Sequence, residues 1–84
     1  MKNLSQLKWQ CRRGVKELDL VLGTYLREHY EQADDSEKAS FVNLLQMEDP
    51  LLFDLLLGNI ASTNKNQAIL IKKLREIVTT QHNQ

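Results

Sequence analysis

The sequence is poor in the residues that reinforce a small domain or build a phosphate site: it has one cysteine, one proline and three glycines among 84 residues. The lone thiol, Cys11, excludes an internal disulfide framework and favours a reducing compartment. Three scattered glycines cannot form a glycine-rich phosphate loop. No apolar run approaches the roughly 20 residues that span a bilayer, and no signal peptide is visible. We therefore expect one cytoplasmic domain over residues 1–84 without membrane insertion.

Clusters of catalytic or metal-binding side chains are also lacking. His29 and His82 lie far apart in the sequence, and the position of His29 on an apolar stripe favours a core histidine over a ligand. Cys11 lies on an apolar helix face, which favours a buried thiol over a nucleophile. Glu17 and Asp19 are two residues apart, so a helix turns them about 200° from each other and they cannot act as a paired acid and base. The sequence therefore predicts no catalytic residue, no metal site and no enzyme.

Charge of one overall sign is absent as well, because 11 basic residues balance 11 acidic residues. This balance argues against a general nucleic-acid binder, which carries a net basic surface. The charge is uneven along the chain, since five basic residues precede the first acidic residue: Lys2, Lys8, Arg12, Arg13 and Lys16. They could form a solvated helix face, a basic helix on a membrane surface, or a docking surface for an acidic partner.

Apolar residues recur at helical spacing in five segments. The first contains Leu4, Leu7 and Cys11 and ends before Gly14, which suits a left-handed helix end. The second runs from about 15 to 33, with one face formed by Leu18, Val21, Leu22, Tyr25 and His29. The third follows a turn and cap at 34–36 and carries Phe41, Leu44 and Leu45.

The last two segments begin and end at recognisable signals. Asp49-Pro50 predicts a helix start with Asp49 as the cap, and Gly58 can end that helix. This fourth helix is apolar nearly all round, so we expect it at the centre of the core. The fifth helix places Leu70, Leu74, Ile77 and Val78 together, and residues 79–84 are expected to fray. The prediction is an all-α, compact five-helix bundle that is monomeric.

Trp9 lies off the apolar stripe of the first helix. At 100° per residue it is roughly 140° from Leu4, and Arg13 follows at i+4 on the same side. An exposed Trp–Arg pair has the composition of an interface hot spot, and the indole could stack beneath the guanidinium. The alternative is that Trp9 packs against a neighbouring helix, because tryptophan is usually well buried.

Each of the charged residues and the glycine after Trp9 could have either a structural role or a role in contacting a partner. Gly14 permits a sharp turn and the close approach of another backbone. Glu17 in the first turn of the second helix either interacts with the helix dipole or faces a partner. Arg12 and Arg13 are bidentate donors for carboxylate or phosphate, or else a solvated pair. Asp19 makes either a partner contact or a local hydrogen bond.

Residues 9–19, with the sequence WQCRRGVKELD, resemble the signature of the FAD assembly factors of succinate dehydrogenase, the SdhE family. The family motif Arg-Gly-x-x-Glu is matched by Arg13, Gly14 and Glu17, and Asp19 follows at the expected place. A second match comprises 41–45, Glu48-Asp49-Pro50 and Leu52-Phe53, although Leu55 stands where the family often has tryptophan. The resemblance covers residues 4–78.

This resemblance implies a five-helix protein of the bacterial cytoplasm, or of mitochondria in eukaryotes, that binds the flavoprotein subunit of succinate dehydrogenase and often that of fumarate reductase. It implies assistance with the covalent attachment of FAD to a histidine of that subunit, so that FAD belongs to the client and not to this chain. The implied partner-binding residues are Trp9, Arg12, Arg13, Gly14, Glu17 and Asp19. The rival function is a small regulatory, antitoxin-like module that binds another protein and has no role in flavin attachment.

Overall fold

The computed structural model describes residues 4–82, with the side chains of residues 4–79. These residues form five α-helices and one short 3-10 helix, with no strand in the described part of the chain. The elements are α1 (Leu4–Cys11), α2 (Lys16–Glu28), η1 (Tyr30–Gln32), α3 (Asp35–Leu44), α4 (Asp49–Leu57) and α5 (Lys65–His82). The predicted all-α fold with five helices is confirmed.

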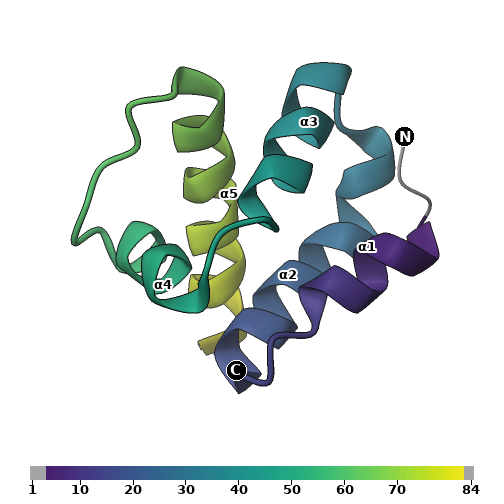
Figure 1. Ribbon diagram of the computed structural model, residues 1–84, viewed down its shortest axis with the longest axis horizontal. Coiled ribbons are helices and arrows are strands. Elements are labelled where there is room, and N and C mark those ends of the chain that lie inside the picture. The colour runs from purple at the N-terminus through teal and green to yellow at the C-terminus, as the bar shows by residue number, and fades with distance from the viewer. Residues whose placement is uncertain (1–3, 83–84) are drawn as a thin grey trace.

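Helix α5 is the element against which the others assemble. It packs against α2, α3 and α4, whereas α1 packs against α2. Figure 1 accordingly shows α1 and α2 side by side in one half of the molecule and α4 beside α5 in the other. The fully buried side chains that join these helices are Leu7, Leu18, Leu22, Tyr25, Phe41, Leu44, Leu52, Leu70 and Leu74.

Two of the predicted helix boundaries have the expected local chemistry. The Asp34 carboxylate accepts a hydrogen bond from the Glu37 main-chain N–H at 2.8 Å and caps α3. Gly58 ends α4 with a φ of +82°, a left-handed conformation that glycine adopts without steric cost. These signals could be recognised in the sequence because they depend on neighbouring residues alone.

The start of α4 differs from the prediction by one residue. Glu48 occupies the cap position without a side-chain hydrogen bond, and Asp49 is the first helical residue. The Asp49 carboxylate instead lies 3.5 Å from the Arg13 guanidinium. Asp49 therefore takes part in a tertiary contact rather than in a cap.

The prediction that α4 lies at the centre of the core is wrong. Only Leu52 and Leu55 of α4 are buried, while Leu51 is 41% exposed and Leu57 is 69% exposed. The helix lies at the edge of the bundle with one face on α5. Its other apolar face is left at the surface.

The prediction of a buried His29 is also wrong. Helix α2 ends at Glu28, so the apolar stripe stops one turn earlier than expected, and His29 is exposed. Its ring stacks on the edge of the core, with its centroid 5.8 Å from that of Tyr25. Tyr30, in the short 3-10 helix, takes the buried place at this end of the core.

A polar contact joins three helices at the edge of the core, where the Lys73 side chain is exposed. The Tyr25 hydroxyl donates to Glu37 Oε2 at 2.5 Å, and Lys73 Nζ lies 2.6 Å from Glu37 Oε1. Burial raises the pKa of the Tyr25 hydroxyl, and the Glu37 carboxylate raises it further. Burial alone would raise the pKa of Glu37, but the bonds from Lys73 and Tyr25 outweigh it and lower that pKa below 4.5. Glu37 thus connects α2, α3 and α5.

The segment predicted to fray, 79–84, is helical as far as His82. Residues 83–84 lie outside the described residues, as does Lys2 of the N-terminal basic run.

Candidate functional site

The predicted site residues lie in and around the turn between α1 and α2. Helix α1 ends at Cys11, and the Arg12 main-chain N–H closes its last turn on the Trp9 carbonyl at 3.1 Å. Gly14 then reverses the chain with a φ of +78°, which disfavours residues with a Cβ. Helix α2 begins two residues later, at Lys16. The motif is therefore a tight helix–turn–helix junction.

The turn is closed from within by Asp19. Its Oδ1 atom accepts a hydrogen bond from the Arg13 main-chain N–H at 2.5 Å. The predicted alternative of a local hydrogen bond for Asp19 is thereby confirmed. Because the bond spans Gly14, it fixes the direction in which α2 leaves the turn.

Arg13 is an internal anchor rather than a surface residue. Its side chain is 14% exposed, and its guanidinium donates to the Met47 carbonyl at 2.7 Å and to the Leu45 carbonyl. Asp49 lies 3.5 Å from the same group. These contacts join the motif turn to the connection between α3 and α4.

The predicted Trp9–Arg13 pair is not formed. Helix α1 ends before Arg13, so the i+4 geometry does not apply, and the guanidinium points to the carbonyls after α3. The Trp9 side chain is 78% exposed, which also rules out its packing against a neighbouring helix. Trp9 is therefore exposed at the surface, and its indole is not paired with Arg13.

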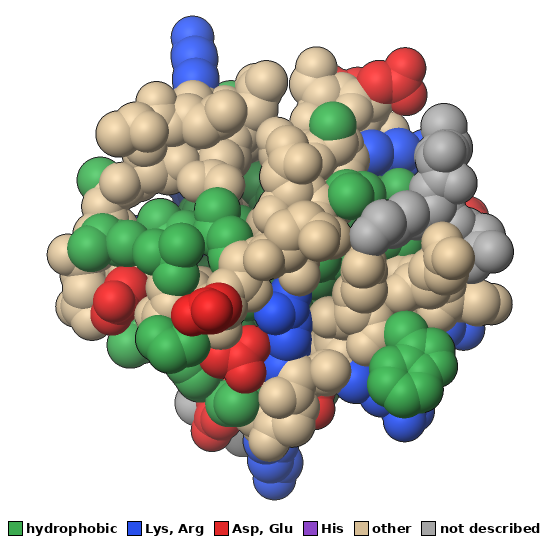
Figure 2. Space-filling model, viewed as in Figure 1, with side chains coloured by type: hydrophobic (Ala, Val, Ile, Leu, Met, Phe, Trp, Pro, Cys, Tyr) green, Lys and Arg blue, Asp and Glu red, His purple; other side chains and the backbone are tan. Residues whose placement is uncertain are grey.

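Among the predicted site residues, the exposed ones are Trp9, Arg12, Gly14 and Glu17, and Lys16 beside them is exposed too. Apolar side chains reach the surface over α1 in Figure 2, with basic side chains beside them. A Cβ added to Gly14 would meet no atom within 4 Å, so the space in front of this turn is open. The carboxylate of Glu17 forms no hydrogen bond or ion pair with any described residue. These residues are free to contact a partner.

Cys11 lies behind this surface and is 3% exposed, as predicted for a buried thiol. Burial raises its pKa from 9.0 to about 11, and the Arg13 charge opposes part of that increase. The thiol is therefore protonated at neutral pH and unsuited to nucleophilic chemistry.

A shallow hollow of about 630 Å³ runs along the packed helices α1 and α2. Its lining contains both signs of charge, from Lys8, Arg12, Arg27, Asp19 and Glu31, together with Leu4, Cys11, Gly23 and Leu26. The mixed charge offers hydrogen-bonding partners of both kinds to a protein surface rather than a cage for one anion.

A second, more apolar groove lies on the other side of Glu17, between α2 and α4, and sequence reasoning did not predict it. Its residues come from three helices that are distant in the sequence, and Leu57 was expected in the core. An apolar helix with more hydrophobic residues than one face needs is the signal that could have indicated it.

The described residues contain no group of three His, Cys, Asp or Glu side chains that could hold a metal ion. Over the same part of the chain, no helix combines the length and apolar character needed to cross a membrane.

Comparisons with known proteins match most of the chain. The protein-family model described as the flavinator of succinate dehydrogenase matches residues 5–78. The FAD assembly factor SdhE of Aliivibrio fischeri is 38% identical over 72 residues, covering 86% of this chain and 84% of the relative. That of Coxiella burnetii is 35% identical over 72 residues, covering 86% and 88%. That of Wigglesworthia glossinidia brevipalpis is 33% identical over 75 residues, covering 89% of each chain.

Proposed function

This chain belongs to the family of flavinators of succinate dehydrogenase, and we propose that it is a FAD assembly factor for the flavoprotein subunit of that enzyme. Members of the family are assembly factors and not enzymes. The chain binds the flavoprotein and promotes the covalent attachment of FAD to a histidine of that client. FAD belongs to the client, and this chain has no cofactor of its own.

The contribution of this chain is positional. A factor that holds a client in one conformation can align two reacting groups and thereby reduce the entropic part of the barrier. The motif fits this role. Its one thiol, Cys11, is protonated and therefore a poor nucleophile, and its exposed charged side chains, such as Arg12 and Glu17, can contact a partner. The client histidine and the flavin supply the chemistry.

The client contacts the exposed motif residues Trp9, Arg12, Gly14 and Glu17, while Arg13 and Asp19 hold the turn that presents them. The observation that carries this proposal is the division of the motif into an anchored half and a free half. Arg13 and Asp19 are bonded inside the protein, whereas Glu17 has no partner among the described residues and Gly14 faces open space. Tryptophan and arginine are the residues most enriched at interface hot spots.

We further propose that the factor acts as a monomer in the bacterial cytoplasm and that the flavoprotein of fumarate reductase is a second client. The bacterial origin of the relatives and the single, unpaired cysteine support this location.

The experiment is complementation of a bacterial strain that lacks its own assembly factor. Covalent flavin on the denatured flavoprotein is read as in-gel fluorescence, against the amount of subunit on an immunoblot. Wild-type protein restores the fluorescent band, whereas Glu17→Gln and Trp9→Ala restore little of it and bind the flavoprotein at least about tenfold more weakly.

Lys72→Ala is the matched control, because Lys72 is exposed on α5, away from the motif. It restores the band fully. An unrestored band with folded wild-type protein would refute the function. Full restoration by Glu17→Gln and Trp9→Ala would refute the docking surface alone.

A further inference from the structure

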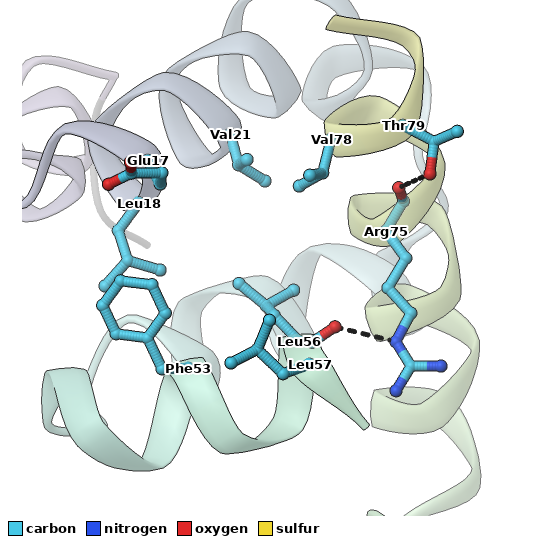
Figure 3. A pocket seen from close by; sticks show the side chains of 9 residues that line it. All are labelled: Glu17, Leu18, Val21, Phe53, Leu56, Leu57, Arg75, Val78 and Thr79. Carbon is cyan, nitrogen blue, oxygen red and sulfur yellow. Dashed lines mark hydrogen bonds between the residues drawn. The ribbon is translucent and has the colours of Figure 1, made fainter. Parts of the chain in front are cut away.

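An apolar groove of about 420 Å³ runs between α2 and α4. Both helices pack on α5, and the groove separates them from each other. Figure 3 shows the lining side chains arranged around an empty centre. They are Glu17, Leu18 and Val21 from α2, Phe53, Leu56 and Leu57 from α4, and Arg75, Val78 and Thr79 from α5.

The side chains that line the groove differ in how far they are buried. Leu18 and Val21 are nearly fully buried and form its base, while Phe53 and Leu56 are partly buried. Leu57 stands at the rim and is 69% exposed. A large aliphatic side chain at the mouth of an otherwise apolar groove is characteristic of a binding surface that a partner's side chain completes.

The two charged residues of the groove, Arg75 and Glu17, differ in whether they have a bonding partner within the protein. Arg75 donates to the Leu56 carbonyl at 2.9 Å and to the Leu55 carbonyl at 3.4 Å, so its guanidinium neutralises the negative end of α4. Glu17 lies across the groove from Arg75 in Figure 3 and has no partner among the described residues. Arg75 is therefore already hydrogen-bonded, and the charged group at the groove that has no partner in the described part of the chain is the Glu17 carboxylate.

The surrounding sequence strengthens this preference for a cation. Residues 46–64, which include the whole of α4, contain no lysine or arginine and three acidic residues, of which Asp49 is paired with Arg13 while Glu48 and Asp54 have no cationic partner within residues 4–79. Opposite charge on a partner would steer it to this side of the molecule.

We propose that this groove binds a segment of the client flavoprotein in which one or two large apolar side chains stand next to a lysine or arginine. The apolar side chains enter between Phe53 and Leu57, and the basic residue pairs with Glu17. This inference rests on the proposed function, because Glu17 belongs both to the groove and to the motif surface, so a protein docked on the motif extends into the groove. Contacts at both the motif surface and the groove would then fix the orientation in which the client binds.

The test begins with Leu57→Gln, which removes the apolar rim without touching the core, and Ile69→Gln as the matched control. Ile69 is 49% exposed on α5 and does not line the groove. Binding to purified flavoprotein is measured by titration. Leu57→Gln weakens binding at least about tenfold with an unchanged helical spectrum, and Ile69→Gln binds like wild type.

A photo-crosslinking amino acid at position 57 identifies the occupant directly. The expected product joins the factor to a flavoprotein peptide that contains an apolar residue adjacent to lysine or arginine. Cross-linking to a second copy of this chain, or to a flavoprotein peptide without a basic residue, would overturn the proposal. So would a Leu57→Gln variant that binds as tightly as wild type.

The outcomes separate this inference from the proposed function. If wild type and Leu57→Gln both bind the flavoprotein and restore flavin attachment, the groove proposal fails and the assembly function stands. If wild-type protein does not bind the flavoprotein, both fail. Self-association that Leu57→Gln abolishes, with client binding unchanged, would assign the groove to a second copy and also overturn the proposal.

Discussion

The main-chain N–H of Arg13 donates to Oδ1 of Asp19 at 2.5 Å, which bonds the two ends of the motif turn across Gly14. The same Arg13 extends its side chain in the opposite direction, to carbonyls that follow α3. One residue therefore fixes both the shape of the turn and its place in the bundle, while its neighbours Arg12 and Gly14 are exposed.

Loss of the Arg13 side chain is expected to destabilise the fold. Arg13→Ala leaves the Leu45 and Met47 carbonyls without their donor, so the free energy of unfolding falls by about 2–3 kcal/mol. In a domain of this size that lowers Tm by about 10–20 °C. Trp9→Ala, which removes an exposed side chain, changes stability by less than about 0.5 kcal/mol. Urea and thermal denaturation measure both, and equal stabilities for the two variants would contradict the anchoring role.

The glycines Gly14 and Gly23 are expected to respond to alanine with opposite signs. Gly14→Ala forces a left-handed φ on a residue with a Cβ and lowers the free energy of unfolding by about 1–2 kcal/mol. Gly23 lies inside α2 with no atom within 4 Å of an added Cβ, so Gly23→Ala raises it by about 0.5–1 kcal/mol. Denaturation curves of the two variants provide the comparison. A stabilising Gly14→Ala would mean that the turn has another conformation in solution.

The Glu37 contact is expected to make stability sensitive to acid. The folded protein lowers the Glu37 pKa below 4.5, so the stabilisation from this carboxylate is complete above pH 4.5 and is lost as the pH falls through the folded pKa. Glu37→Gln removes this part of the dependence. Urea denaturation at a series of pH values from neutral to acid tests it. Parallel pH profiles for the variant and wild type would show that Glu37 does not contribute.

Cys11 is expected to resist thiol reagents. A pKa raised from 9.0 to about 11 leaves about a hundredfold less thiolate at pH 8 than an exposed cysteine has. The reaction with a chromogenic disulfide is therefore slow in the folded protein and fast in denaturing urea. Because Cys11 is the only cysteine, the signal has a single source. Rapid labelling of the native protein would show that the α1–α2 junction opens readily.

Local signals in the sequence predicted the five helices, and long-range contacts explain the differences. Gly58 and the cap at Asp34 depend on adjacent residues and lie where predicted. The side chain of Arg13 was misplaced, because nothing near it in the sequence indicates carbonyl acceptors at Leu45 and Met47. The many leucines of α4 likewise predicted a central position for that helix. The sequence does not distinguish a leucine at the edge of a groove, such as Leu57, from a leucine in the core.

The family resemblance identified the motif, whereas only the structure divides it by role. Trp9 and Glu17 are exposed as a docking surface requires, while the guanidinium of Arg13 is bonded internally. The residue pattern alone could not make this distinction, because a solvated arginine and an anchored arginine have the same sequence context.

The span of the Arg13 contacts makes the shape of the motif turn depend on complete folding. The guanidinium reaches acceptors that lie 32 to 36 residues further along the chain. Contacts of such separation form only when the intervening helices have assembled, since closing long loops has an entropic cost that local contacts do not offset. A nascent or partly unfolded chain would contain the motif sequence without its shape. If the flavoprotein recognises this turn, as we propose, it would bind folded copies of the factor and pass over unfolded ones.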